Sequence, residues 1–123
     1  MSARKFWLLA IIILVTLAGC HFPDQPWVLI EITNLENGQH VLFNEGVLIY
    51  AKARSSQGIS RVELYINGEL TATQLPARGN PRDLIAELPF APLTEGSVIV
   101  SVLAVDRKGT VSDPFSITLN VVS

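Results

Sequence analysis

Few side chains in this chain are of the types that perform catalysis. The 123 residues include one cysteine, Cys20, and two histidines, His21 and His40. Nucleophilic catalysis needs a nucleophile with a base beside it, and no serine here lies in a G-x-S-x-G turn. Zinc needs several ligands, and neither histidine has a second one at helical or hairpin spacing. We therefore expect no enzyme, no metal and no cofactor, which leaves Cys20 as the residue with chemistry to explain.

Cys20 ends a segment that has the three parts of an export signal. Arg4 and Lys5 form a positive start, and residues 6–17 form an apolar run shorter than the ~20 residues that span a bilayer. Leu17, Ala18 and Gly19 then lead into the cysteine. This order resembles a bacterial lipoprotein signal peptide with its lipobox. The resemblance implies cleavage between Gly19 and Cys20 and attachment of lipid to Cys20; an uncleaved signal anchor with a free thiol is the alternative.

This interpretation divides the chain into a signal peptide (1–19), a lipidated cysteine with a short tether (20–26) and one domain (27–123). Several acyl chains on Cys20 would give a stable membrane anchor. The seven residue steps from Cys20 to Trp27 reach at most ~25 Å, so the domain should stay close to its membrane. His21 stands where an inner-membrane retention signal typically has aspartate. We therefore expect an exported protein at the outer membrane or the outer cell surface.

The charge of the mature chain limits its partners. Cleavage would remove Arg4 and Lys5 and leave seven basic against eleven acidic residues, a net charge of −4. This balance argues against nucleic acid and against electrostatic adhesion to anionic lipid. We expect attachment to the membrane through the acyl chains alone.

Alternating apolar residues predict strands throughout residues 27–123. Asn67-Gly68 is a strong hairpin signal, and Ile59 is out of phase with the residues after it, which predicts a bulge near Ser60. Residues 97–106 are apolar on both faces and predict a central strand buried on both sides. The other strands are expected at 28–33, 41–44, 47–54, 61–66, 69–74, 83–88 and 115–121, with a loop at 75–82 and a crossing between sheets at 89–96. About seven strands without a helix favour a two-sheet antiparallel β-sandwich, with a small closed barrel as the alternative.

Two motifs in this pattern resemble a known family. G-I-S-R-V-E-L-Y-I-N-G at residues 58–68 resembles the central hairpin of bacterial Ig-like domains, and V-x-A-x-D-x-x-G at 102–109 resembles their penultimate strand and turn. The resemblance spans 27–123 and implies an Ig-like β-sandwich without a shared active site. Such domains serve surface and secreted proteins as spacers, adhesion modules or binding modules, usually in tandem. A single domain on a lipid favours a binding or adhesion module; a structural spacer or a remnant of a longer surface protein is the alternative.

Candidate binding residues follow from the same alternation. Tyr50 and Arg54, together with Arg61 and Tyr65, are expected to face outward and could form one partner-binding face, because Tyr and Arg are common interface anchors. We favour the alternative, an ordinary solvated face with cross-strand charge pairs. In the loop, Arg78 and Arg82 could meet an acidic protein or the carboxylates of a glycan at the envelope or cell surface. We favour the alternative, a solvated loop whose two arginines serve solubility.

Two further residues have open or structural interpretations. Trp27 either lies at the lipid headgroups or packs over the end of the sandwich, and we favour the packed position. Asp106 begins a turn with Gly109, and a calcium site there would have only Asp113 as a second acid. We expect Asp106 to accept hydrogen bonds from the backbone of its own turn.

Overall fold

The structure, a computed structural model, describes residues 25–123, so the predicted signal peptide, Cys20 and most of the predicted tether lie outside the described residues. Residues 25–123 form eight strands and contain no helix long and apolar enough to cross a membrane. The strands are β1 (Val28–Ile32), β2 (His40–Leu42), β3 (Val47–Ser55), β4 (Ile59–Ile66), β5 (Glu69–Gln74), β6 (Asp83–Phe90), β7 (Gly96–Asp106) and β8 (Phe115–Val122).

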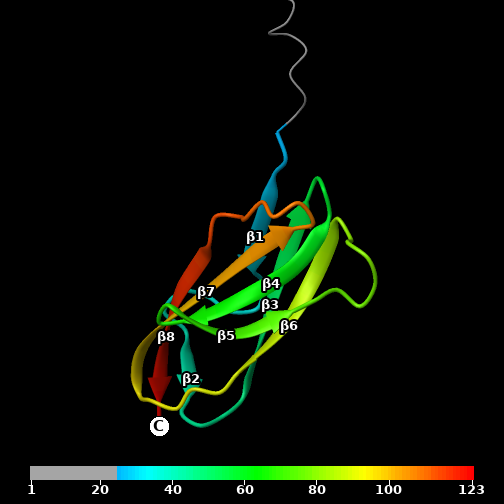
Figure 1. Ribbon diagram of the computed structural model, residues 1–123. Helices are drawn as coiled ribbons and strands as arrows, with labels where there is room; N and C mark the ends of the chain where they lie inside the picture. Colours follow the sequence, from blue (N-terminus) through cyan, green and yellow to red (C-terminus); the bar gives the residue numbers. More distant parts are fainter. Residues whose placement is uncertain (1–24) are drawn as a thin grey trace, which may run out of the picture.

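The strands pack as two sheets (Figure 1). The smaller sheet has the order β1-β3-β6, and the larger has the order β2-β8-β7-β4-β5. All pairings are antiparallel except that of β2 with β8, which is parallel. The predicted β-sandwich is confirmed, with eight strands where about seven were expected.

The core lies between the inner faces of the two sheets. In β3 the buried residues Ile49, Ala51 and Ala53 alternate with outward ones, and in β7 the buried positions run from Val98 to Ala104 in the same period of two. The whole buried cluster comes from residues between Val28 and Val121. This part of the chain therefore supplies a hydrophobic core of its own, and we expect it to fold without the signal peptide.

Two local features of β4 follow the sequence closely. The pairing of β4 with β7 shifts register between Ile59 and Arg61, and Ile59 is fully buried, which confirms the predicted bulge. At the other end of β4 the backbone φ is 50° at Asn67 and 85° at Gly68, the two positive values that a two-residue hairpin turn needs.

Two expectations about β6 and β7 were wrong. β7 is central in its sheet, yet its outer face is buried only toward one end: Ile99 is 51% exposed and Leu103 is half-buried, whereas Val105 is 3% exposed. β6 continues through Pro89 to Phe90, where a crossing was expected to begin. Because β6 is an edge strand that pairs only with β3, a proline without an N–H is tolerated there.

The first described residues lie at one end of the sandwich, which we call the tether end, and the C-terminus lies at the other, which we call the far end (Figure 1). Backbone hydrogen bonds assemble the tether end. The amide of Ser56 donates to the carbonyl of Trp27 over 3.1 Å, and the amide of Arg107 donates to the carbonyl of Gly58 over 3.0 Å. At the far end the β4–β5 hairpin meets the β6–β7 crossing.

Candidate binding sites

The predicted single binding face does not exist. Tyr50 and Arg54 lie on β3 in the smaller sheet, whereas Arg61 and Tyr65 lie on β4 in the larger sheet. All four face outward as expected, but on the two opposite outer faces of the sandwich. The turn at residues 56–58 carries the chain from one sheet to the other, and alternation within each strand cannot show that change of sheet.

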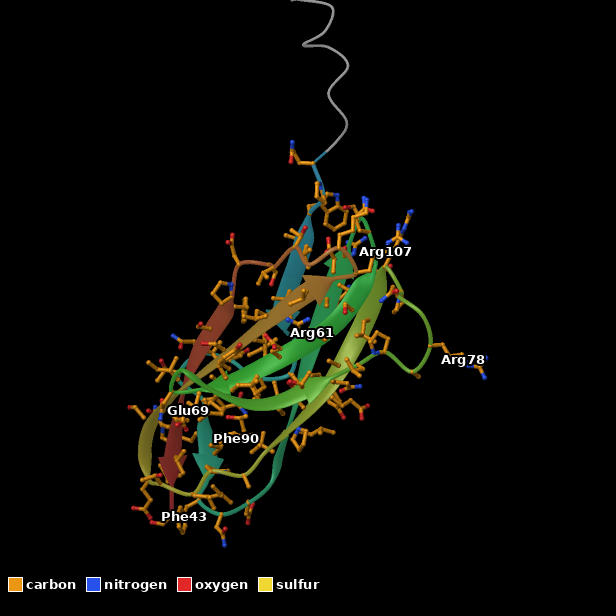
Figure 2. All side chains as sticks on the ribbon, in the orientation of Figure 1. Phe43, Arg61, Glu69, Arg78, Phe90 and Arg107 are labelled. Carbon is orange, nitrogen blue, oxygen red and sulfur yellow. The ribbon has the colours of Figure 1, made fainter. Side chains whose placement is uncertain are left out.

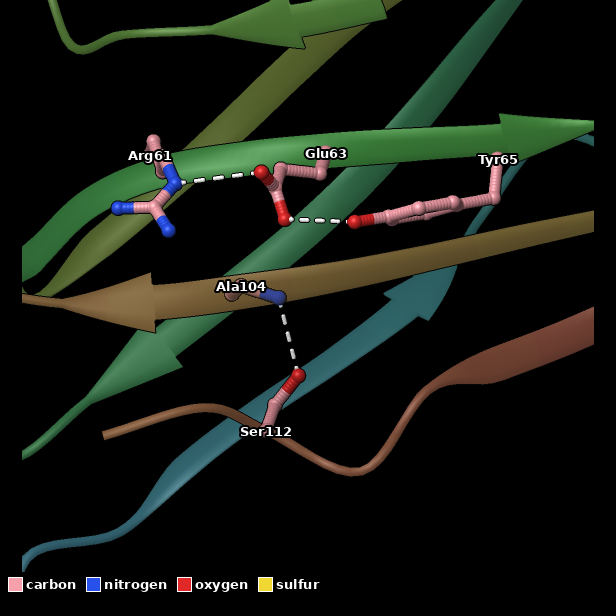
Figure 3. Close-up of polar contacts among 5 residues, drawn as sticks. All are labelled: Arg61, Glu63, Tyr65, Ala104 and Ser112. Carbon is pink, nitrogen blue, oxygen red and sulfur yellow. Dashed lines mark hydrogen bonds and ion pairs between the residues drawn. The ribbon is translucent and has the colours of Figure 1, made fainter. Parts of the chain in front are cut away.

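Arg61 and Tyr65 both contact Glu63, which lies between them on β4 (Figure 3). Nε of Arg61 lies 3.3 Å from Oε2 of Glu63, and the hydroxyl of Tyr65 donates to Oε1 of Glu63 over 3.1 Å. This hydrogen bond to a carboxylate, helped by partial desolvation, raises the pKa of the Tyr65 phenol above its usual value. The charged and polar groups of this row thus pair with one another, as expected of an ordinary solvated sheet face.

The outer face of the smaller sheet carries a similar pair. Nε of Arg54 lies 2.9 Å from Oδ1 of Asp83, its neighbour across the β3–β6 pairing, and both side chains are more than half exposed. Exposed pairs of this kind contribute about 0–1 kcal/mol. Tyr50 is half-buried on the same face.

The loop between β5 and β6 holds Arg78 and Arg82 apart. Both are exposed, but Arg78 projects from the side of the domain in Figure 2, well away from Arg107. Arg82 lies at the tether end, where its carbonyl accepts a 2.9 Å hydrogen bond from the amide of Ser55. The two arginines do not form one site.

The tether end also contains Trp27 and the turn of Asp106. Trp27 is 45% exposed, so it packs only in part over the end of the sandwich. Oδ1 of Asp106 accepts hydrogen bonds from the amides of Lys108, at 2.9 Å, and Thr110, at 2.8 Å, which confirms the expected structural role. Within residues 25–123 no three His, Cys, Asp or Glu side chains gather as a metal site would need.

The far end contains a groove that the sequence did not reveal. Its volume is about 480 Å³, within the range of ligand-binding clefts. Apolar side chains from four separate strands line it: Ile66, Phe90, Val98 and Val121. The crossing between β6 and β7 forms one wall, on which Leu93 is 74% exposed.

The charged side chains that line the groove are all negative. Glu69 and Glu95 are the charged residues among those that line it, and the lining includes no lysine, arginine, histidine or cysteine from the part of the chain described. The arrangement offers an apolar floor next to two carboxylates. It suits a ligand group that is apolar along its length and positively charged at its end.

The comparisons with known proteins agree with this fold. Residues 29–80, which span β1 to β5, match the family model described as a bacterial Ig domain. The chain carries a bacterial Ig-like domain. Among solved structures, the domain is similar to the fibronectin(III)-like modules of CbhA from Clostridium thermocellum, at 26% identity and a TM-score of 0.61. That match covers 80% of this chain and 48% of the other, so the chain spans about half the length of that structure.

A second solved structure is similar over its full length. The Ig-like domain matches a CARDB domain from Pyrococcus furiosus at 21% identity and a TM-score of 0.61, over 81% of this chain and 98% of the other. At this identity the likeness establishes the fold alone. A search of curated proteins found no match.

Proposed function

We propose that this protein is a membrane-anchored lipoprotein of the envelope or cell surface, whose Ig-like domain is a non-catalytic binding module. The observation that carries the proposal is the position of the groove. It lies at the far end, opposite Trp27, where the tether to Cys20 begins. A partner held there is kept away from the membrane surface, and bacterial Ig-like domains commonly serve in this extracytoplasmic setting.

The groove also indicates the chemistry of the partner. Leu93, which is 74% exposed, and the half-buried Ile66 offer apolar surface above the buried Phe90, and Glu69 and Glu95 add negative charge. We propose a protein of the envelope or surface that inserts an apolar side chain with a lysine or arginine next to it. Buried apolar contact would supply the affinity, and the carboxylates would select the cation.

The anchor is tested by replacing its cysteine. Cys20→Ser should abolish the added lipid mass on the mature N-terminus and move the protein from the membrane fraction to the soluble fraction, as measured by mass spectrometry and fractionation. His21→Ser, next to it, is the control and should change neither. Equal processing and membrane association of Cys20→Ser would contradict the lipoprotein assignment.

The groove is tested in living cells by a photo-crosslinking amino acid at Thr94, an exposed position on the groove wall. We expect one recurring protein partner, whose crosslink is lost in Glu69→Lys and Glu95→Lys. Glu36→Lys, which changes the net charge equally at an exposed position outside the groove, should retain it. Crosslinks that do not recur, or that survive both groove variants, would contradict the binding module and favour the structural alternative.

A further inference from the structure

The basic residues of the domain are concentrated toward the tether end. The two ion pairs among residues 25–123 engage Arg54 and Arg61. Arg82, Arg107 and Lys108 are exposed and have no carboxylate partner within this part of the chain. Figure 2 shows nitrogen-bearing side chains gathered around Arg107 at this end.

The backbone fixes these three residues on one tip. The carbonyl of Arg82 is bound by the amide of Ser55, and the amide of Arg107 is bound to Gly58, which lies in the turn that follows β3. Lys108 donates its own amide to the carboxylate of Asp106. The positive tip is therefore a rigid part of the sandwich, because each basic residue is held through its main chain.

Acidic side chains near the tip do not cancel this charge on the exposed surface. Asp83 is paired with Arg54, and Asp106 is 1% exposed. Asp113 is exposed and lies near this end, because the amide of its neighbour Ser112 donates to the carbonyl of Ala104, so one carboxylate offsets part of the charge of the three basic residues and leaves the tip positive.

The far end has the opposite character. Glu69 and Glu95 line the groove, and Glu45 lies close by, because the neighbouring amide of Asn44 donates to the carbonyl of Pro92 over 2.8 Å. The negative net charge of the mature chain thus conceals a positive tip and a negative far end.

Trp27 adds an amphipathic aromatic ring to the positive tip. It is 45% exposed, and its amide is held by the hydroxyl of Ser56 at 3.1 Å. Tryptophan is enriched at membrane–water interfaces, where its ring meets apolar chains and its N–H meets water. The ring lies seven residues from Cys20, within ~25 Å of chain.

We propose that Trp27, Arg82, Arg107 and Lys108 form a docking surface for the anionic headgroups of the membrane. The domain then stands end-on, with the groove directed away from the lipid. The proximity of this membrane rests on the lipid anchor proposed above, whereas the affinity of the tip for anionic lipid does not. Each basic residue near an anionic surface strengthens binding about fivefold, so three residues give roughly a hundredfold at low salt.

The mature protein contains its own reporter for this contact. Once Trp7 leaves with the signal peptide, Trp27 is the sole tryptophan. The experiment uses the full mature lipidated protein in vesicles of phosphatidylcholine, with and without phosphatidylglycerol. In the anionic vesicles we expect a blue shift of the Trp27 emission and quenching by brominated lipid, both reversed by salt near 0.5 M, because the Debye length then falls to about 4 Å.

Matched double variants separate the tip from the overall charge. Arg107→Glu with Lys108→Glu should reduce the ratio of docked to undocked protein by at least about 25-fold, from the loss of two basic residues. Lys52→Glu with Arg78→Glu makes the same change in net charge at exposed positions away from the tip, and should leave the Trp27 signal almost unchanged. Circular dichroism serves to check that both double variants remain folded.

The outcomes for docking and for the anchor are distinct. An unchanged Trp27 signal in anionic vesicles, or equal loss in both double variants, would overturn the docking surface. A shift with soluble dextran sulfate but none with anionic vesicles would overturn it in favour of a polyanionic glycan. Failure of the protein to float with neutral vesicles would overturn the lipid anchor alone. In that case the docking surface would still be supported if the protein floated with anionic vesicles at low salt and if this flotation were lost in Arg107→Glu with Lys108→Glu.

Discussion

The side chain of Ser112 offers the sharpest test of how the tether end is held together. The pairing of β8 with β7 ends at Val102, so the edge of β7 beyond that residue needs other partners. Ser112 supplies them: its amide donates to the carbonyl of Ala104 over 2.9 Å, and its hydroxyl accepts from the amide of Ala104 over 2.9 Å (Figure 3). Ala104 is fully buried and Ser112 is 7% exposed.

Ser112→Ala keeps the backbone bond but leaves the buried amide of Ala104 without an acceptor. A buried donor left unpaired costs about 1–3 kcal/mol of unfolding free energy. For a domain of this size each kcal/mol lowers Tm by about 4–8 °C. The measurement is thermal and urea unfolding of a soluble form of residues 21–123, followed by circular dichroism.

Two matched substitutions make the test specific. Ser112→Thr retains the hydroxyl and should recover most of the loss. Ser116→Ala removes a hydroxyl that lies 2.7 Å from that of Ser101 on the exposed face, and should change stability by no more than about 0.5 kcal/mol. Equal stabilities of Ser112→Ala and Ser116→Ala would refute the claim that Ser112 completes the edge of β7.

Three further predictions concern the core, a turn and a phenol. Val102→Asp should prevent folding, because a buried unpaired carboxylate costs several kcal/mol against a total stability of about 5–15 kcal/mol; a cooperative unfolding transition in this variant would contradict the placement of β7. Gly58→Ala should lose about 2 kcal/mol in urea unfolding, because φ is +96° there and the new methyl would overlap the backbone oxygen of Asn80, whereas Gly46→Ala has open space and should be nearly neutral. The raised pKa of Tyr65 favours the folded state at neutral pH, and this contribution should disappear as the pH rises above about 10. Ultraviolet absorbance titration, with Tyr65→Phe to isolate the signal, should show this phenol titrating earlier in Glu63→Gln, and an unchanged midpoint would rule out the carboxylate as the cause.

Local signals in the sequence were sufficient for most of the fold. The bulge at Ile59 and the turn at Asn67-Gly68 depend on neighbouring residues alone, so their pattern predicted them correctly. The burial of β7 depends on what covers each face of the sheet. An apolar Ile99 predicts a covered face, but the structure leaves it open.

The candidate binding sites were harder to predict because they combine distant segments. The groove joins Ile66, Phe90 and Val121, and no periodicity within one strand relates these positions. The positive tip likewise joins Arg82 and Arg107 through backbone bonds to the same stretch near Ser55 and Gly58. The net charge of the chain averages over both ends and therefore hides the difference between them.

In the anchored protein that we propose, the placement of the tether and the groove at opposite ends would determine how the domain carries mechanical load. A pull between Trp27 and a partner at the far end acts along β1, which pairs with β3 from Val28↔Ser55 to Ile32↔Ala51. Hydrogen bonds in an antiparallel pair lie perpendicular to the strands. The pull therefore loads all the hydrogen bonds between β1 and β3 in shear at the same time, and does not break them one after another. The pairing of β1 with β3 should for this reason resist mechanical unfolding of the domain from its N-terminal end.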